Sequence, residues 1–127
     1  MQPYTITFEC DFSEFWRYNL IIQGETLRSG ERYQAISHLD KVAPLGSELS
    51  QQPADYSRAP KTEIVTESGD GLRLYIYIMP HTMPFTREIA AAAPFEFRVT
   101  IETPRGQCFK RLYQVNQWSG CNIEITL

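Results

Sequence analysis

The chain has 127 residues, of which 43% are apolar and 21% are charged, and its formal net charge is −3. This is the composition of an ordinary globular protein, and the length favours one domain that spans residues 1–127. The sequence has neither the basic stripe typical of a nucleic-acid binder nor an apolar run long enough to cross a bilayer as a helix. We therefore expect no nucleic-acid partner and no membrane span.

The first residues carry no basic segment followed by an apolar stretch, so the sequence shows no signal peptide and a cytoplasmic protein is expected. The mature part of an exported protein, cloned with a new Met, is the alternative.

The cysteines are Cys10, Cys108 and Cys121, and no two of them form a CxxC pair. This spacing predicts reduced thiols and no zinc site, with one disulfide as the alternative.

Alternation of apolar and polar residues with a period of two dominates the chain and predicts β-strands. The segments that show it, or that flank predicted turns, are residues 5–10, 16–23, 62–67, 72–79, 95–102, 107–115 and 122–127. Residues 30–42 also alternate, less regularly, and are predicted to be a further strand. Trp16 falls on the apolar side of its segment and is expected in the core.

Two turns are predicted to close hairpins. In residues 68–71 (Ser-Gly-Asp-Gly), glycine is expected to supply a positive φ, and in residues 103–106 (Thr-Pro-Arg-Gly), proline presets the turn. Residues 116–120 are predicted to be a short connection into the last strand.

Two other connections are longer. Residues 43–60 contain three prolines and are predicted to form an irregular loop. Residues 86–94 begin with Thr86, continue through four alanines and stop at Pro94, which predicts a short helical crossover between the two sheets.

These elements predict an all-β fold, an antiparallel β-sandwich of about seven to eight strands with one short helical crossover. A closed barrel is the alternative, because a barrel also makes every strand alternate.

The sequence contains no Gly-x-Ser-x-Gly, P-loop, Gly-x-Gly-x-x-Gly or His-Glu-x-x-His motif, and it has only two histidines. His38 and Asp40 are spaced to share one face of a strand, which suits a metal ligand pair or an oriented base, but a surface pair is the simpler interpretation. His81 is expected to form a hydrogen bond within its proline-flanked loop. Scattered carboxylates do not favour calcium. We therefore expect no enzyme activity, no cofactor and no metal.

Tyr75, Tyr77 and Met79 are the more informative residues, because they alternate with the core residues of their strand and should lie, with Arg73, on its outer side. An outer sheet face has no need of two tyrosines and a methionine unless a loop or helix of the chain covers it, or a partner does.

Trp118 lies in a predicted turn with Asn116 and Gln117, which is a set that could bind a sugar ring if it were exposed. A tryptophan that closes one end of the sandwich is the alternative.

The sequence thus predicts a non-catalytic interaction module that binds a protein partner, or a second copy, through an outer sheet face or an edge strand. The binding residues would be Arg73, Tyr75, Tyr77, Met79, Asn116 and Trp118. A carbohydrate-binding module and a small metal-dependent hydrolase that uses His38, Asp40 or His81 are the alternatives.

Overall fold

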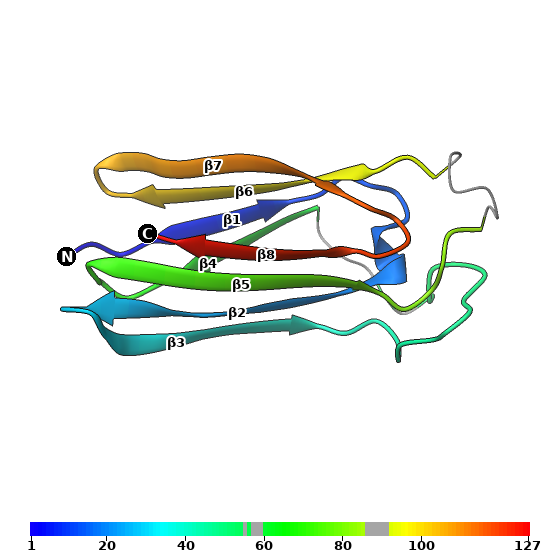
Figure 1. Cartoon of the computed structure of the whole chain (residues 1–127), viewed down its shortest axis with the longest axis horizontal. Helices are drawn as coiled ribbons and strands as arrows, with labels where there is room; N and C mark the ends of the chain where they lie inside the picture. The colour runs from blue at the N-terminus through cyan, green and yellow to red at the C-terminus, as the bar shows by residue number, and fades with distance from the viewer. Residues whose placement is uncertain (55, 57–59, 86–91) are drawn as a thin grey trace.

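Two antiparallel four-stranded sheets face one another in the computed structural model, which describes residues 1–54, 56, 60–85 and 92–127 (Figure 1). The strands are β1 (Thr5–Glu9), β2 (Tyr18–Arg28), β3 (Glu31–Asp40), β4 (Lys61–Val65), β5 (Gly71–Pro80), β6 (Phe95–Thr103), β7 (Gly106–Val115) and β8 (Cys121–Thr126). One short 3₁₀ helix, η1 (Phe15–Arg17), precedes β2. We call the sheet of order β4-β1-β6-β7 the β1 sheet and that of order β3-β2-β5-β8 the β2 sheet. The predicted β-sandwich is confirmed, and the sheets are separate rather than closed into a barrel.

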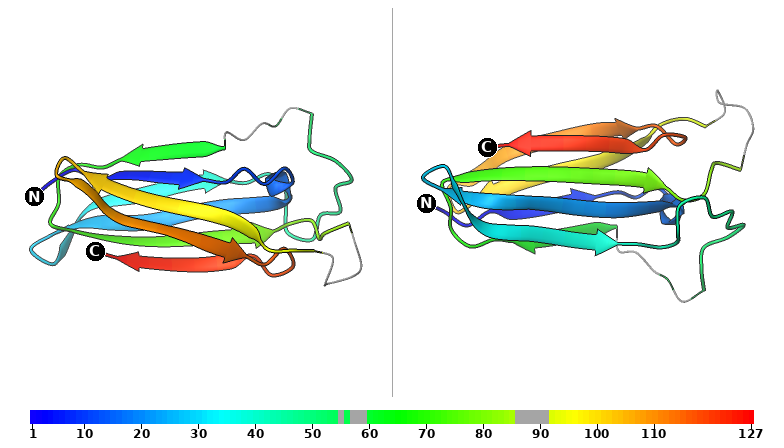
Figure 2. Two further views of the ribbon diagram at one scale, coloured as in Figure 1. Left: turned by 90° about the horizontal axis from the view of Figure 1, so that it is seen from above. Right: turned by 60° about the horizontal axis from the view of Figure 1, so that its bottom comes forward.

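The core lies between the sheets because every second residue of the central strands points inward. Two further views show the sheets lying one over the other (Figure 2). The inward residues with almost no exposure are Ile6, Tyr18, Ile22, Leu72, Leu74, Ile76, Ile78, Phe97, Val99, Ile101 and Val115. An aromatic cluster closes one end of this core, where the rings of Phe12 and Phe95 stack with centroids 4.5 Å apart.

Two hairpins join neighbours within a sheet. The β6–β7 hairpin is confirmed, with Gly106 at φ +122°. A second hairpin, not predicted, joins β2 to β3 through Ser29 and Gly30, whose φ angles of 54° and 80° are those of a tight turn with two left-handed residues.

The hairpin predicted at residues 68–71 is wrong. Its two flanking strands lie in different sheets, because β4 pairs with β1 whereas β5 pairs with β2 and β8. Gly69 instead exchanges backbone hydrogen bonds with Gln2, and neither it nor Gly71 has a positive φ. A Cβ at Gly69 would stand 2.8 Å from the carbonyl oxygen of Leu27, so glycine is needed here for close approach. Turn residues predict a reversal of the chain but not its hydrogen-bonding partner.

The strand predicted from residue 16 begins at Tyr18 instead, because Phe15, Trp16 and Arg17 form η1. All three are buried, and a strand with one solvent-facing side cannot bury consecutive side chains. Trp16 is buried as expected, with its ring centroid 6.2 Å from that of Phe85.

The connection from β5 to β6 carries the chain from the β2 sheet to the β1 sheet, as predicted. The helical turns expected over residues 86–94 fall mostly on residues 86–91, which lie outside the described residues. In the part of residues 43–60 that is described, the structure contains no helix or strand, as expected of a loop.

Candidate binding face

The outer side of the β2 sheet carries an apolar row that crosses three strands. Leu39 of β3 pairs with Ile21 of β2, and Ile21 pairs with Tyr77 of β5, so the three side chains lie side by side. Tyr75 follows two residues earlier on β5 and shares this side. Leu39 is 62% exposed, and the other three are half-buried. We call these four residues, Ile21, Leu39, Tyr75 and Tyr77, the tyrosine face.

The tyrosine hydroxyls of this face are not engaged within the described part of the chain, where neither forms a hydrogen bond with another residue. Exposed polar side chains frame the two rings on the neighbouring strands. They are Gln23, Ser37, Asn122 and Glu124. The face therefore combines apolar area with free hydrogen-bonding groups at its centre and rim.

Arg73 and Met79, the two other residues predicted on the outer side of β5, lie at opposite ends of this face. Met79 is half-buried beside its cross-strand partner Asn19, and the Asn19 side chain is covered because it donates to Ala43 O at 2.7 Å and accepts from Val42 N at 2.7 Å. The loop after β3 thus covers the sheet at this end, in line with one of the two alternatives that the sequence left open.

At the other end, Arg73 is occupied by an ion pair. Its Nη1 lies 3.5 Å from Glu25 Oε1, and the same carboxylate lies 3.0 Å from Arg32 Nε. All these groups are solvated, so the pairs orient side chains more than they stabilise the fold. Of these four residues on the outer side of β5, Tyr75 and Tyr77 thus lie between the covered end and the ion-paired end, and both are half-buried.

The structure gives Asn116 and Trp118 turn roles. Asn116 Oδ1 accepts hydrogen bonds from the backbone N–H groups of Trp118 at 2.8 Å and of Ser119 at 3.1 Å. Trp118 is half-buried, and its buried Nε1 has no hydrogen-bond partner among the described residues. Gln117, the third member of the expected sugar-binding set, forms hydrogen bonds with Arg17 and Ala93. The three residues therefore do not form one exposed surface.

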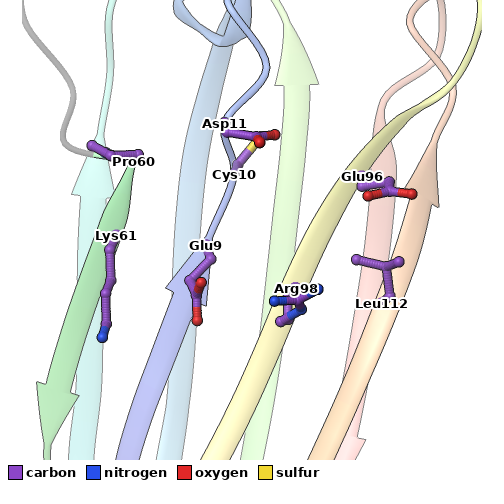
Figure 3. Close-up of a pocket in the computed structure, with 8 residues that line it drawn as sticks. All are labelled: Glu9, Cys10, Asp11, Pro60, Lys61, Glu96, Arg98 and Leu112. Atoms are coloured by element: carbon purple, nitrogen blue, oxygen red, sulfur yellow. The ribbon is translucent and has the colours of Figure 1, made fainter.

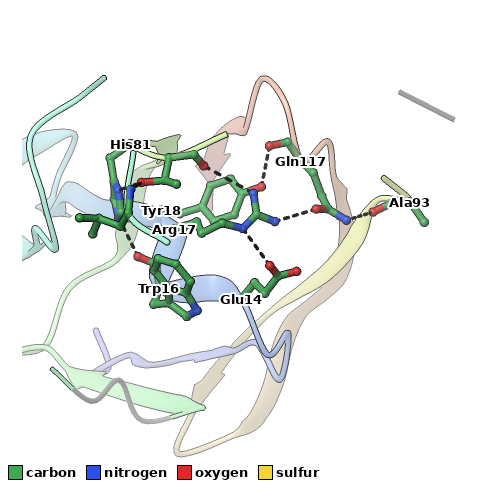
Figure 4. A network of polar contacts seen from close by, with 9 residues as sticks. Glu14, Trp16, Arg17, Tyr18, His81, Ala93 and Gln117 are labelled. Carbon is green, nitrogen blue, oxygen red and sulfur yellow. Dashed lines mark hydrogen bonds and ion pairs between the residues drawn. The ribbon is translucent and has the colours of Figure 1, made fainter. Parts of the chain in front are cut away.

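Gln117 belongs to a polar network that holds the end of the sandwich together (Figure 4). The fully buried Arg17 donates from Nη2 to Gln117 Oε1 at 2.7 Å and from Nη1 to Thr82 O at 3.5 Å, and Glu14 lies 3.5 Å from its Nε. Gln117 Nε2 donates to Ala93 O at 2.6 Å.

Three rings surround the Arg17 guanidinium. They belong to Phe12, Tyr18 and Phe85, with centroids 5.3–5.9 Å from its Cζ. Tyr18 donates from its hydroxyl to Gln117 O at 2.6 Å, and burial raises the pKa of Tyr18 to about 12 against the opposing effect of Arg17. This network is not predictable from the sequence, because one arginine in an apolar segment indicates no partner.

The two histidines do not share a site. His81 is buried in the same network, where its Nε2 donates to Trp16 O at 2.6 Å and its Nδ1 lies 2.8 Å from the Thr82 hydroxyl, so the predicted loop hydrogen bond is present. His38 lines a cavity of about 200 Å³ between β3 and β4, and Asp40 accepts a hydrogen bond from the Tyr56 hydroxyl at 2.9 Å. Over the described ranges, no group of three or more His, Cys, Asp or Glu side chains could hold a metal ion.

The outer side of the β1 sheet has a different character. A shallow cavity of about 230 Å³ on it is lined mainly by charged groups of both signs (Figure 3). They are Glu9, Asp11, Lys61, Glu96 and Arg98. A larger cavity of about 460 Å³ lies between residues 46–50 and residues 81–85, where Met83 and Phe85 are exposed.

Comparison with known proteins gives no further guidance, because no family, no curated protein and no solved structure matches the chain. Cys10, Cys108 and Cys121 form no disulfide. Among the residues described, the structure has no helix of the length and apolar character needed to cross a membrane.

Proposed function

We propose that this protein is a non-catalytic interaction module that binds a protein partner through the tyrosine face. The observation that carries the proposal is the in-register row of Leu39, Ile21 and Tyr77 on the outer side of the β2 sheet. If this side of the sheet contacted only water, polar residues would be expected at these positions.

The chemistry of the face suits a protein–protein contact. The centres of such contacts are enriched in aromatic residues and depleted in charge, and a polar rim surrounds them. Tyr75 and Tyr77 supply rigid apolar area with a hydroxyl at the tip. The outer side of the β1 sheet carries mixed charges instead, so a residue on it can serve as the control position in a binding experiment.

Site-specific photocrosslinking tests the proposal. A photoreactive amino acid replaces Tyr77 in one variant and the exposed Glu63 of β4 in the other, and both are expressed in the native host. We expect a protein that crosslinks at Tyr77 and not at Glu63, and that is displaced by excess unlabelled chain.

Binding to that purified partner should then weaken about tenfold or more in Tyr77→Glu and stay within about twofold in Glu63→Gln. Equal crosslinking from both positions, or an unchanged affinity in Tyr77→Glu, would contradict the proposal.

Carbohydrate binding is the second candidate, and one observation favours it. Tyr75 and Tyr77 stand next to the exposed side chains of Gln23, Asn122 and Glu124, and such a combination can stack on sugar rings and bind their hydroxyls. A glycan array separates the two candidates. A hit that is lost in Tyr75→Ala would favour this alternative, whereas an empty array would exclude it for the glycans displayed.

A metal-dependent hydrolase is the least supported of the candidate functions. His38 and His81 line different cavities. Both ring nitrogens of His81 form hydrogen bonds within the fold, with Thr82 and Trp16.

A further inference from the structure

We infer that the chain forms a two-fold dimer in which β8 pairs antiparallel with β8 of a second copy and continues the β2 sheet across the interface. The inference does not depend on the proposed partner of the tyrosine face, since it concerns the edge of the sheet and not its outer side.

The hydrogen-bond pattern of β8 shows which of its backbone groups are free. Leu72 and Leu127 exchange both backbone hydrogen bonds, at 3.1 and 2.8 Å. Bonded and non-bonded pairs alternate along an antiparallel ladder, so the next bonded pairs join Ile125 and Ile123 to β5.

The N–H and C=O groups of Asn122, Glu124 and Thr126 therefore point away from β5. Within the described chain none of them has a hydrogen-bond partner. They offer a strand of a second molecule a complete set of donors and acceptors.

Two of the other three edges carry inward-pointing polar or charged residues, a feature that discourages pairing of sheet edges. On β7, Arg111 lies opposite the core residue Val99, yet it is exposed. On β3, His38 and Asp40 lie on the inward side with Ile36.

The third edge, β4, has only five residues, follows Pro60 and begins with a lysine. By contrast, the inward residues of β8 are Cys121, Ile123 and Ile125, and the strand contains no lysine, arginine or proline. Arg111 also keeps the two β7 edges from pairing, so the dimer continues only the β2 sheet.

The sequence of β8 is complementary to itself in one register. When Ile123 faces Ile123 of the second copy, Asn122 lies opposite Glu124 of the second copy in a bonded pair, and the symmetry repeats this pair. The amide can donate to the carboxylate in both pairs. A shift by two residues would place Glu124 opposite Glu124 of the second copy, where like charges repel.

This register also places the two tyrosine faces on the same side of one eight-stranded sheet. Tyr77 aligns with Asn122, and Tyr75 aligns with Glu124. Tyr77 of one copy and Tyr75 of the other therefore lie in one row, three strand spacings or about 14 Å apart.

A proline placed on the free edge tests the dimer without touching the ladder to β5. Glu124→Pro removes an N–H that points to the second copy, and proline is tolerated on an edge strand whose N–H faces outward. Ser37→Pro is the matched control on β3, the opposite edge of the same sheet. The alternation of bonded pairs leaves the Ser37 N–H pointing outward as well, since Tyr75 bonds to Gln23 and Gln23 lies opposite Ser37.

Sedimentation equilibrium between roughly 10 µM and 1 mM, a range for weak specific association, should show a dimer for the unmodified chain and for Ser37→Pro. Glu124→Pro should be a monomer with the far-ultraviolet spectrum of the unmodified chain. A monomeric unmodified chain, or a dimer that survives Glu124→Pro, would overturn the inference.

A second pair of variants tests the register with no change to the backbone. Asn122→Asp would face Glu124 of the second copy and should weaken the dimer about three- to tenfold, whereas Asn122→Lys should strengthen it. Equal dissociation constants for the two variants would overturn the pairing, even if Glu124→Pro failed to fold.

Discussion

Arg17 donates a hydrogen bond to Gln117 across 100 positions of sequence, at 2.7 Å, and the arginine side chain is fully buried. This contact ties η1, at the start of β2, to the turn between β7 and β8. Since Thr82 accepts from the same guanidinium, three connections meet on one side chain at this end of the sandwich. The network thus supplies the partners of a buried cation whose burial the sequence does not predict.

Removal of the Arg17 side chain should destabilise the fold strongly. We expect Arg17→Ala to lower the free energy of unfolding by about 3–5 kcal/mol, because it empties an aromatic enclosure and leaves Gln117 without its donor. Arg17→Met should cost about 1 kcal/mol, since it refills that space and avoids the desolvation of a charge. Urea denaturation measures both, with Lys110→Met, on the exposed outer side of β7, as a control that should change little. Equal losses in the Met and Ala variants would show that the charge, and not the packing, stabilises the network.

Stability at high pH should depend on Tyr18. Burial raises the pKa of Tyr18 to about 12 from an ordinary value of 10.0, so the fold favours the neutral phenol that donates to Gln117 O. A group with a raised pKa contributes its full stability below the unfolded value, and it loses that contribution as the pH rises through the folded value. The unmodified chain should therefore lose stability between pH 10 and pH 12 more steeply than Tyr18→Phe. Thermal unfolding across this range, with Tyr33→Phe at an exposed position as control, measures the difference, and parallel curves for all three chains would refute it.

Gly120 should be the least replaceable of the glycines with positive φ. A Cβ there would stand 2.0 Å from the carbonyl oxygen of Ile78, whereas a Cβ at Gly46 would meet nothing within 4 Å. Both have positive φ, of 72° and 84°, so both substitutions share a backbone strain of about 1 kcal/mol. Gly120→Ala should cost at least about 2 kcal/mol more than Gly46→Ala in denaturant unfolding, because the β7–β8 connection must move. Similar losses at the two positions would mean that the connection adjusts freely.

Arg111 should protect the β7 edge from aggregation. Arg111→Ile would extend the apolar inner side of β7 to solvent while changing thermal stability little. We expect faster growth of light scattering at high concentration than for the unmodified chain. Lys110→Ile, one residue away on the outer side of the strand, is the control for added hydrophobicity, and equal scattering from the two variants would argue against a role for the inward charge.

The alternation of apolar and polar residues was sufficient to predict the strands, because each strand buries one side and exposes the other. The same rule placed Tyr75 and Tyr77 on the outer side of β5, where the structure has them. It failed at Trp16, since a 3₁₀ turn at the closed end of the sandwich buries three consecutive residues and obeys no period of two.

Strand pairing could not be derived from turn residues. Residues 68–71 contain two glycines between two strands, yet the chain there leaves one sheet for the other. The tyrosine face was only partly predictable from the sequence for the same reason. Leu39 and Ile21 join Tyr77 in a row that exists only once β3, β2 and β5 have their register.

The place of β1 in its sheet bears on how the molecule assembles. It is made first, yet it lies between β4 and β6, and its residues pair with partners more than fifty positions downstream. Among the strands described, only β2–β3 and β6–β7 pair through a short turn. The remaining pairings join segments that are distant in the sequence, and this slows folding. A nascent chain that has emerged from the ribosome only as far as β5 can pair its first strand with β4 but leaves the β6 side of that strand open. Unpaired strand edges of this kind make folding intermediates prone to aggregation.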